Sequence, residues 1–273
     1  MDDDGNHPGR LLIIGGAEDR CDGTGLLERF VELSGGAGAR IVLVTAATRA
    51  PDEVHADYER VFRRLGADRT IQLELHGRYD ADSDDAAKVL HDATGVFISG
   101  GDQSRLMALV GSRVNDILED RLNAEDGVVV AGTSAGATAM GRTMILGGEG
   151  PDVSASAVRT GPGLGLIPNV LIDMHFGERG RLPRLLSAVA LDPDHLGVGI
   201  DENTGVLVED GSFEVLGSGV ATFVDAESAT VIHPAGDQEP TTLFGVRLHL
   251  LPAGCIFDTA TREASIGPAH DRY

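Results

Sequence analysis

Residues 127–141 read GVVVAGTSAGATAMG, and this stretch decides the fold. It begins with a β-branched run typical of a buried strand and continues into small residues typical of a closely packed helix. Residues 132–136 match the pattern G-x-S-x-G, with Ser134 at its centre. In that pattern the serine sits on a strained turn between strand and helix, and its hydroxyl projects above the sheet edge. The stretch therefore predicts an α/β fold with a nucleophilic serine.

Four more short apolar runs precede this stretch, and each predicts a buried strand because it ends in glycine or small residues. They are RLLIIGG (10–16), RIVLVTAA (40–47), TIQLEL (70–75) and GVFISGG (95–101). Helical segments are expected at 25–34, 53–65, 84–93 and 103–119. This alternation predicts a mostly parallel sheet with helices on both faces.

The chain changes character toward its C-terminus. The segments GVGI (197–200), GVLVED (205–210) and FEVLGSGVATFVD (213–225) are short strand patterns separated by turns, which favours antiparallel hairpins. No linker, low-complexity tract or internal repeat divides the sequence. We therefore expect one domain over residues 1–273, with antiparallel additions toward the C-terminus.

The charge is strongly acidic, with 43 Asp and Glu against 22 Lys and Arg and a net charge of −21. Nucleic acids and anionic membranes bind basic patches, so neither is an expected partner. The acidic excess fits a surface adapted to high salt, and it also fits a cationic substrate. Net charge alone does not separate these two interpretations.

The first ten residues, MDDDGNHPGR, lack the apolar core of a signal peptide, and no run reaches 18 apolar residues. We therefore expect a cytoplasmic protein. The two cysteines, Cys21 and Cys255, form no CxxC pair, so neither a metal site nor another cofactor is expected.

A serine hydroxyl needs a base within hydrogen-bonding reach and a group that orients this base. Of the nine histidines, His175 stands out because it follows an apolar run in VLIDMHFGERGRLPRL (170–185). We expect its imidazole to meet the Ser134 hydroxyl over the sheet edge. Asp173, Asp201 and Glu202 are all candidates for the orienting acid, and spacing does not choose among them.

Backbone N–H groups near Ser134 are expected to form an oxyanion hole. Ala135 begins the following helix, and Gly101 lies in the loop FISGGDQSRL (97–106), where backbone can approach a bound group. Gln103 of this loop can hydrogen-bond a substrate. The alternative is that Asp102 and Gln103 simply begin the next helix.

Five motifs follow one another in the stretch from residue 11 to about residue 225. They are GGAEDR (15–20), FISGGDQSRL (97–106), GTSAGATAM (132–140), DMHFGERGRLPRL (173–185) and GIDENT (199–204). As a set, these motifs resemble those of cyanophycinases. That family consists of serine peptidases related to the aspartyl dipeptidases, with a class I glutamine-amidotransferase-like fold.

The resemblance implies hydrolysis of cyanophycin, a poly-aspartate that carries an arginine on each β-carboxyl, to β-aspartyl-arginine dipeptides. It implies Ser134 as the nucleophile, His175 as the general base and Glu202 as the orienting acid. It also suggests a homodimer.

The same resemblance implies a set of substrate contacts. Gln103 and Asp173 would hold the substrate, and the arginines of residues 173–185 would pair with substrate carboxylates. These arginines are Arg179, Arg181 and Arg184. The alternative for them is surface pairing with acidic residues such as Glu178. Pro183 suits the first turn of a helix, which would leave Arg179 and Arg181 in the preceding loop.

One position departs from the family pattern. The residue before the catalytic histidine is usually glutamine, whereas this chain has Met174, which offers no hydrogen-bond donor. This difference favours a second interpretation, an aspartyl dipeptidase or another small-peptide hydrolase on the same scaffold. A third interpretation is a binding protein that kept the fold without catalysis, and the intact triad speaks against it.

Overall fold

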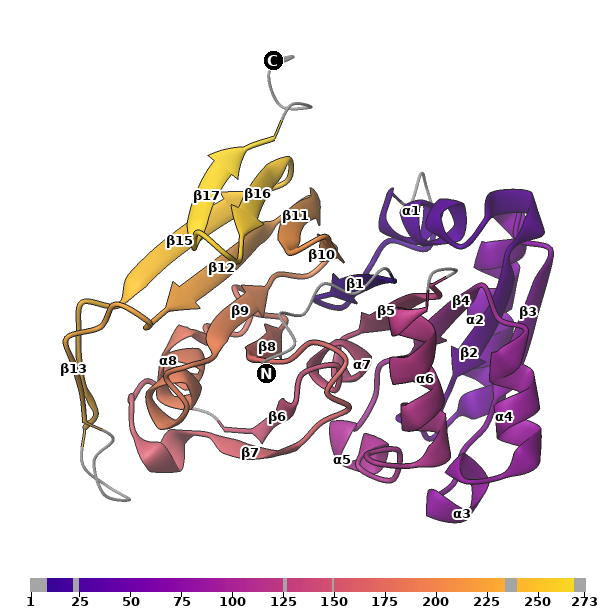
Figure 1. Cartoon of the computed structure of the whole chain (residues 1–273), viewed down its shortest axis with the longest axis horizontal. Coiled ribbons are helices and arrows are strands. Elements are labelled where there is room, and N and C mark those ends of the chain that lie inside the picture. Colours follow the sequence, from indigo (N-terminus) through magenta and orange to yellow (C-terminus); the bar gives the residue numbers. More distant parts are fainter. Residues whose placement is uncertain (1–8, 22–24, 125–126, 149, 234–239, 268–273) are drawn as a thin grey trace.

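The computed structural model describes residues 9–21, 25–124, 127–148, 150–233 and 240–267. A nine-stranded sheet runs in the order β17-β16-β11-β10-β1-β5-β4-β2-β3 (Figure 1). Five of its strands are mutually parallel, as predicted. They are β1 (Arg10–Ile14), β5 (Val129–Thr133), β4 (Gly95–Ile98), β2 (Arg40–Val44) and β3 (Arg69–Leu73).

Helices cover both faces of the parallel strands, which confirms the predicted α/β arrangement. Because successive strand residues point to opposite faces, β1 contributes to two cores. Leu12 and Ile14 pack with α1 (Gly25–Leu33) and α2 (Pro51–Arg64). Leu11 and Ile13 belong to the cluster that contains the apolar side chains of the helices on the other face. These helices are α4 (Asp84–His91) and α6 (Arg113–Asn123).

The helix expected at 103–119 is wrong as a single element. The structure has a short α5 (Gln103–Leu106), a turn, and then α6. Gly111 has φ +62°, a left-handed conformation that terminates helices at little cost only for glycine. Ser112 then starts α6 as its N-cap, because its side chain accepts a hydrogen bond from the Asn115 N–H.

The C-terminal half adds antiparallel strands to the sheet edge beside β1, as predicted (Figure 1, orange to yellow). These strands are β10 (Thr204–Glu209), β11 (Ser212–Gly217), β16 (Cys255–Asp258) and β17 (Glu263–Ile266). A second sheet has the order β15-β12-β9-β8. Its members are β15 (Arg247–Pro252), β12 (Val220–Asp225), β9 (Leu196–Ile200) and β8 (Val170–Met174).

Smaller elements complete the described chain. The helices are α3 (Arg78–Ala81), α7 (Ala135–Thr138), α8 (Leu182–Leu191) and the 3-10 turns η1 (Gly36–Gly38) and η2 (Ala155–Ala157). Two hairpins pair β6 (Thr143–Gly147) with β7 (Arg159–Pro162), and β13 (Val231–His233) with β14 (Thr242–Phe244). None of the described helices has the length and apolar character that a bilayer crossing requires.

The two larger sheets share one hydrophobic cluster. It joins Ile98 of β4 to Val198 of β9 and Phe223 of β12, and each of these side chains is at most 1% exposed. Separate domains would instead each enclose a core of their own. This shared cluster supports the prediction of one domain.

We propose on this basis that the chain unfolds in one cooperative step. Differential scanning calorimetry should give a single transition whose calorimetric and van't Hoff enthalpies agree. The Ser134→Ala variant is a suitable control, because it leaves the shared cluster intact. Two resolved transitions in both proteins would contradict the one-domain proposal.

Candidate active site

Ser134 occupies the sharp turn between β5 and α7. Its backbone has φ 52° and ψ −113°, a conformation that non-glycine residues rarely adopt. Glycines flank the turn for a steric reason. A Cβ at Gly132 would lie 2.6 Å from the Gly136 carbonyl oxygen, and one at Gly136 would lie 2.2 Å from that of Ile98. The strand and the helix can therefore cross closely enough to leave the Ser134 side chain partly exposed at the sheet edge.

A continuous hydrogen-bonded chain links Ser134 to His175 and Glu202. The Ser134 Oγ lies 2.9 Å from His175 Nε2, and His175 Nδ1 lies 2.6 Å from Glu202 Oε1. The His175 side chain is 12% exposed and that of Glu202 is 37% exposed. The imidazole is thus held between a hydroxyl and a carboxylate, and the carboxylate of Glu202 is partly open to solvent.

The other candidate acids are engaged elsewhere. The Asp201 carboxylate accepts hydrogen bonds from the N–H groups of Gly177 and Val220. Asp173 is fully buried and pairs with Arg184. Of the three acids that the sequence left open, Glu202 is the one in contact with His175.

The end of β1 contacts the segments that carry Ser134, His175 and Glu202 through backbone carbonyls. The Ile14 carbonyl accepts from Ser134 N at 3.0 Å, that of Gly15 from His175 N at 2.8 Å, and that of Gly16 from Asn203 N at 2.9 Å. A Cβ at Gly16 would lie 2.4 Å from the imidazole Cε1, so a larger residue would collide with His175.

Backbone strain gathers at the same place. Seven non-glycine residues have positive φ in the described part of the chain, and four of them lie on these contacting loops. They are Ala17, Ser134, His175 and Asn203. Such conformations persist only where the surrounding structure holds them, and they cluster at functional sites.

Glu18 is a buried carboxylate to which the sequence analysis gave no role. Its Oε2 accepts the Thr133 hydroxyl at 2.5 Å, directly beside Ser134. Its Oε1 accepts from Tyr58 and, at 3.0 Å, from Arg20. Burial and the neighbouring Glu18 carboxylate raise the pKa of Tyr58 well above its usual value, so this phenol stays protonated and donates. The sequence did offer one indication of Glu18, which is that an acidic residue follows closely after the two glycines that end the first strand.

Of the two groups expected to form an oxyanion hole, Ala135 directly follows the serine and Gly101 follows Gly100, which packs against it. Neither the Gly101 N–H nor the Ala135 N–H donates a hydrogen bond to another described residue. Gly100 lies against the serine, because a Cβ built on it would be 3.3 Å from the Ser134 Cβ. Gly101 has φ +146° and packs against the Ala47 carbonyl.

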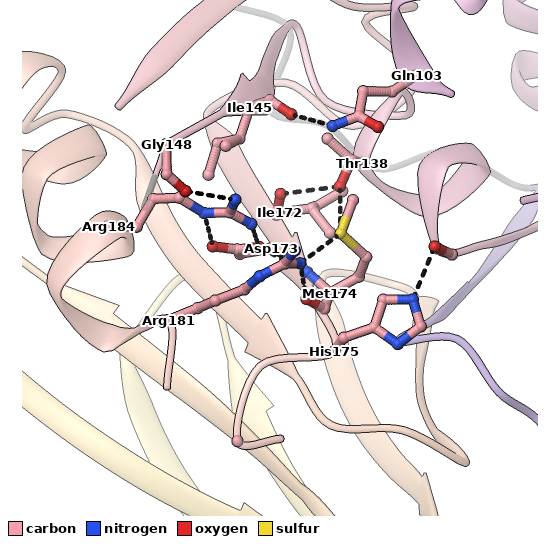
Figure 2. Close-up of polar contacts among 12 residues, drawn as sticks. Gln103, Thr138, Ile145, Gly148, Ile172, Asp173, Met174, His175, Arg181 and Arg184 are labelled. Carbon is pink, nitrogen blue, oxygen red and sulfur yellow. Dashed lines mark hydrogen bonds and ion pairs between the residues drawn. The ribbon is translucent and has the colours of Figure 1, made fainter. Parts of the chain in front are cut away.

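The helix-start alternative at Asp102 is confirmed. Asp102 is the N-cap of α5, because its carboxylate accepts from the Ser104 N–H at 3.0 Å. Gln103 turns its amide toward β6 and donates to the carbonyls of Leu146 at 3.0 Å and Ile145 at 3.3 Å (Figure 2). Its predicted contact with substrate stays a prediction.

The Asp173–Arg184 pair lies next to Met174, the residue before His175 (Figure 2). Arg184 Nε lies 2.8 Å from Asp173 Oδ2, and an Arg184 Nη donates to the Gly148 carbonyl at 3.1 Å. Arg181 approaches the same carboxylate at 3.4 Å. Arg179 is exposed, and α8 has Pro183 in its first turn, so Arg179 precedes the helix as expected. The predicted contacts of these residues with substrate remain predictions.

Met174 fills the space between this pair and His175. It is 4% exposed, and its sulfur lies 3.7 Å from the Thr138 hydroxyl and 3.0 Å from Arg181 (Figure 2). A thioether accepts only weak hydrogen bonds and donates none. The position next to the imidazole therefore presents a soft apolar surface instead of an amide.

Comparison with known proteins identifies the family. The model of peptidase family S51 matches residues 11–216. The cyanophycinase of Trichormus variabilis is 40% identical over 249 residues, covering 89% of this chain and 83% of that protein. The cyanophycinase of Geminocystis herdmanii is 35% identical over 262 residues, covering 94% and 96%.

A solved structure shares the fold. It is a peptidase from an acI-B1 Actinobacterium, with a TM-score of 0.66 and 22% identity over 96% of this chain and 98% of that one. At this identity the likeness concerns the fold alone. The match to the family model and the identity to the two curated relatives establish more: the chain belongs to peptidase family S51 and is a peptidase.

Proposed function

We propose that the protein is a serine peptidase that hydrolyses cyanophycin to β-aspartyl-arginine dipeptides. The observation that carries this proposal is the chain from the Ser134 hydroxyl through His175 to Glu202, at 2.9 Å and 2.6 Å. The substrate comes from the relatives, which are cyanophycinases 35–40% identical to this chain.

The geometry supports a two-step reaction. His175 Nε2 takes the proton of Ser134 as the Oγ attacks an aspartyl backbone carbonyl, and Glu202 stabilises the imidazolium through Nδ1. The N–H groups of Ala135 and Gly101 receive the negative oxygen of the tetrahedral intermediate. The C–N bond then breaks, and the departing amine takes the proton from His175.

The second step releases the acyl group. Water attacks the Ser134 ester, again with His175 as the base, and collapse of the intermediate frees the carboxylate product and restores the serine hydroxyl. In this proposal Gln103 and Asp173 position the substrate, and the three arginines Arg179, Arg181 and Arg184 favour its carboxylates. The buried Asp173–Arg184 pair supports a role for both residues in fixing the shape of the floor of the site.

Met174 favours a second candidate on the same scaffold. Since this residue cannot donate a hydrogen bond to an arginyl group, one polymer contact expected from the family pattern is missing. A hydrolase for small aspartyl peptides would not need that contact. The reaction is the same in both cases, and only the substrate differs.

Replacing the nucleophile tests the reaction. Ser134→Ala should lower turnover by about 10⁴-fold or more while the melting temperature stays close to that of the wild type. A fluorophosphonate probe should label the wild type on the peptide that contains Ser134, as read by mass spectrometry. The exposed Ser265→Ala variant is the matched control and should keep full activity and labelling. An unlabelled, inactive wild type would favour a non-catalytic relative.

Competing substrates test the specificity. Insoluble cyanophycin should be converted to soluble β-aspartyl-arginine dipeptides, and short Asp-X dipeptides should be cleaved far more slowly. Mass spectrometry of the soluble fraction measures both reactions. Rapid cleavage of the dipeptides with intact polymer would assign the protein to the small-peptide hydrolases instead.

Glu18 is proposed as a positioning residue, because it holds Thr133 beside the nucleophile. Thr133→Val and Tyr58→Phe each remove one hydroxyl that donates to this carboxylate, and each should destabilise the fold by about 1–3 kcal/mol. Only Thr133→Val should slow fluorophosphonate labelling of Ser134, by about tenfold or more, because small displacements of a reacting group are costly. Labelling is measured well below both melting temperatures. Equal slowing in the two variants would reduce Glu18 to a purely structural role.

A further inference from the structure

A second pocket lies on the same edge of the sheet as Ser134. We call it the β2–β3 pocket and define it by Thr45, Thr48, Arg49, Glu74, His76 and Arg105, which line a cavity of about 170 Å³. Because β5, β4, β2 and β3 are adjacent and parallel, the segments after them meet at one edge. With strands about 4.8 Å apart, the pocket lies roughly 10–14 Å from Ser134.

The loop after β4 connects the two places. Gly100 packs against Ser134, and Gly101 packs against the Ala47 carbonyl and the Thr48 nitrogen. The Asp102 N–H donates to that same Ala47 carbonyl at 3.0 Å. The loop of Gly100, Gly101 and Asp102 therefore lies between Ser134 and the β2–β3 pocket.

The pocket carries polar groups that the fold itself does not use. Thr45 is 2% exposed, and its hydroxyl has no hydrogen-bond partner among the described residues. A buried hydroxyl left without a partner destabilises the fold, and a ligand that supplies the partner removes this cost. Arg49 is exposed and makes no hydrogen bond within the described chain, whereas Arg105 commits only its Nε, to the Ala46 carbonyl at 3.0 Å.

The charges of the pocket have two signs. Arg49 and Arg105 are cationic, and Glu74 is anionic and lies 3.2 Å from the His76 ring. Two guanidiniums in one cavity are notable in a chain of net charge −21. Guanidiniums bind carboxylates in a bidentate manner, and a glutamate accepts hydrogen bonds from a guanidinium. A ligand that carries both a carboxylate and a guanidinium would satisfy all of these groups.

We propose that the β2–β3 pocket is a remote subsite for one arginyl arm of the polymer. This inference rests on the proposed function, since each unit of cyanophycin carries an arginine with a free α-carboxylate and a guanidinium. Arg49 and Arg105 hold the carboxylate with the Thr45 hydroxyl, and Glu74 holds the guanidinium. An extended backbone advances about 3.3–3.6 Å per residue, and the arm itself places its carboxylate about 5 Å from the backbone, so the arm belongs to a unit some two to four positions from the scissile bond.

The subsite is tested by comparing a long soluble cyanophycin fragment with the two-unit oligomer, which is too short to reach the pocket. Arg49→Gln should raise KM for the long fragment by about tenfold, the loss expected for one charge-assisted contact, and leave kcat unchanged. KM for the two-unit oligomer and fluorophosphonate labelling of Ser134 should not change. Arg49 makes no hydrogen bond to any other described residue, so the variant should keep its stability.

Glu74→Gln separates specific recognition from simple electrostatics. Both variants should raise KM for the long fragment, because the arm carries both charges, whereas a general field effect would move KM in opposite directions. The exposed Arg29→Gln on α1 is the charge-matched control and should behave as the wild type. An unchanged KM in Arg49→Gln, or an equal rise for the two-unit oligomer, overturns the subsite but leaves the proposed function standing. A wild type that leaves cyanophycin intact overturns both.

Discussion

Three backbone hydrogen bonds from the end of β1 hold the site together. Consecutive carbonyls of residues 14–16 bind the backbone nitrogens of Ser134, His175 and Asn203, which come from three distant parts of the chain. Each of these three residues has a positive φ and would relax if released. The strand end therefore acts as a common support, and its two glycines are required because a Cβ at Gly15 would lie 2.1 Å from the Asp201 carbonyl. Glu18 extends this support to Thr133, so Ser134 is held both through its own backbone and through the neighbouring residue.

The charged groups of the molecule divide into buried pairs and an acidic exterior. Asp173 and Asp225 are fully buried, and each is met by two arginines: Arg181 and Arg184 for the first, Arg247 and Arg262 for the second. Leaving a charge unpaired in the interior is far more costly than pairing it, so these arginines are fixed by the fold. Arg49, Arg105 and Arg179 differ from these arginines because their side chains are exposed to solvent.

Met174 lies beside the proposed catalytic residues without taking part in their hydrogen bonds. The residue is buried against Thr138 and Arg181 and does not touch the hydrogen bonds of the triad. In the proposed reaction the chemistry depends on the Ser134–His175–Glu202 chain, whereas recognition of the substrate depends on groups around it. Family membership therefore fixes the class of reaction more firmly than the substrate, because substrate contacts are made by side chains that can be exchanged without disturbing the turn at Ser134.

The sequence by itself determined the fold class and the turn that carries Ser134, because both depend on local patterns of residues. Alternating apolar runs specify parallel strands and helices, and the glycines around Ser134 specify a turn that few other residues can form. The break between α5 and α6 also has a local cause, at Gly111 and Ser112. It is missing from the sequence-based prediction because the residues on both sides follow a helical pattern and together resemble one helix. Only the tertiary structure chose Glu202 over Asp173 and Asp201, and only it revealed Glu18 and the β2–β3 pocket. Their partners lie up to 115 residues away in the chain, and a contact of this kind depends on how the strand ends meet at one edge of the sheet.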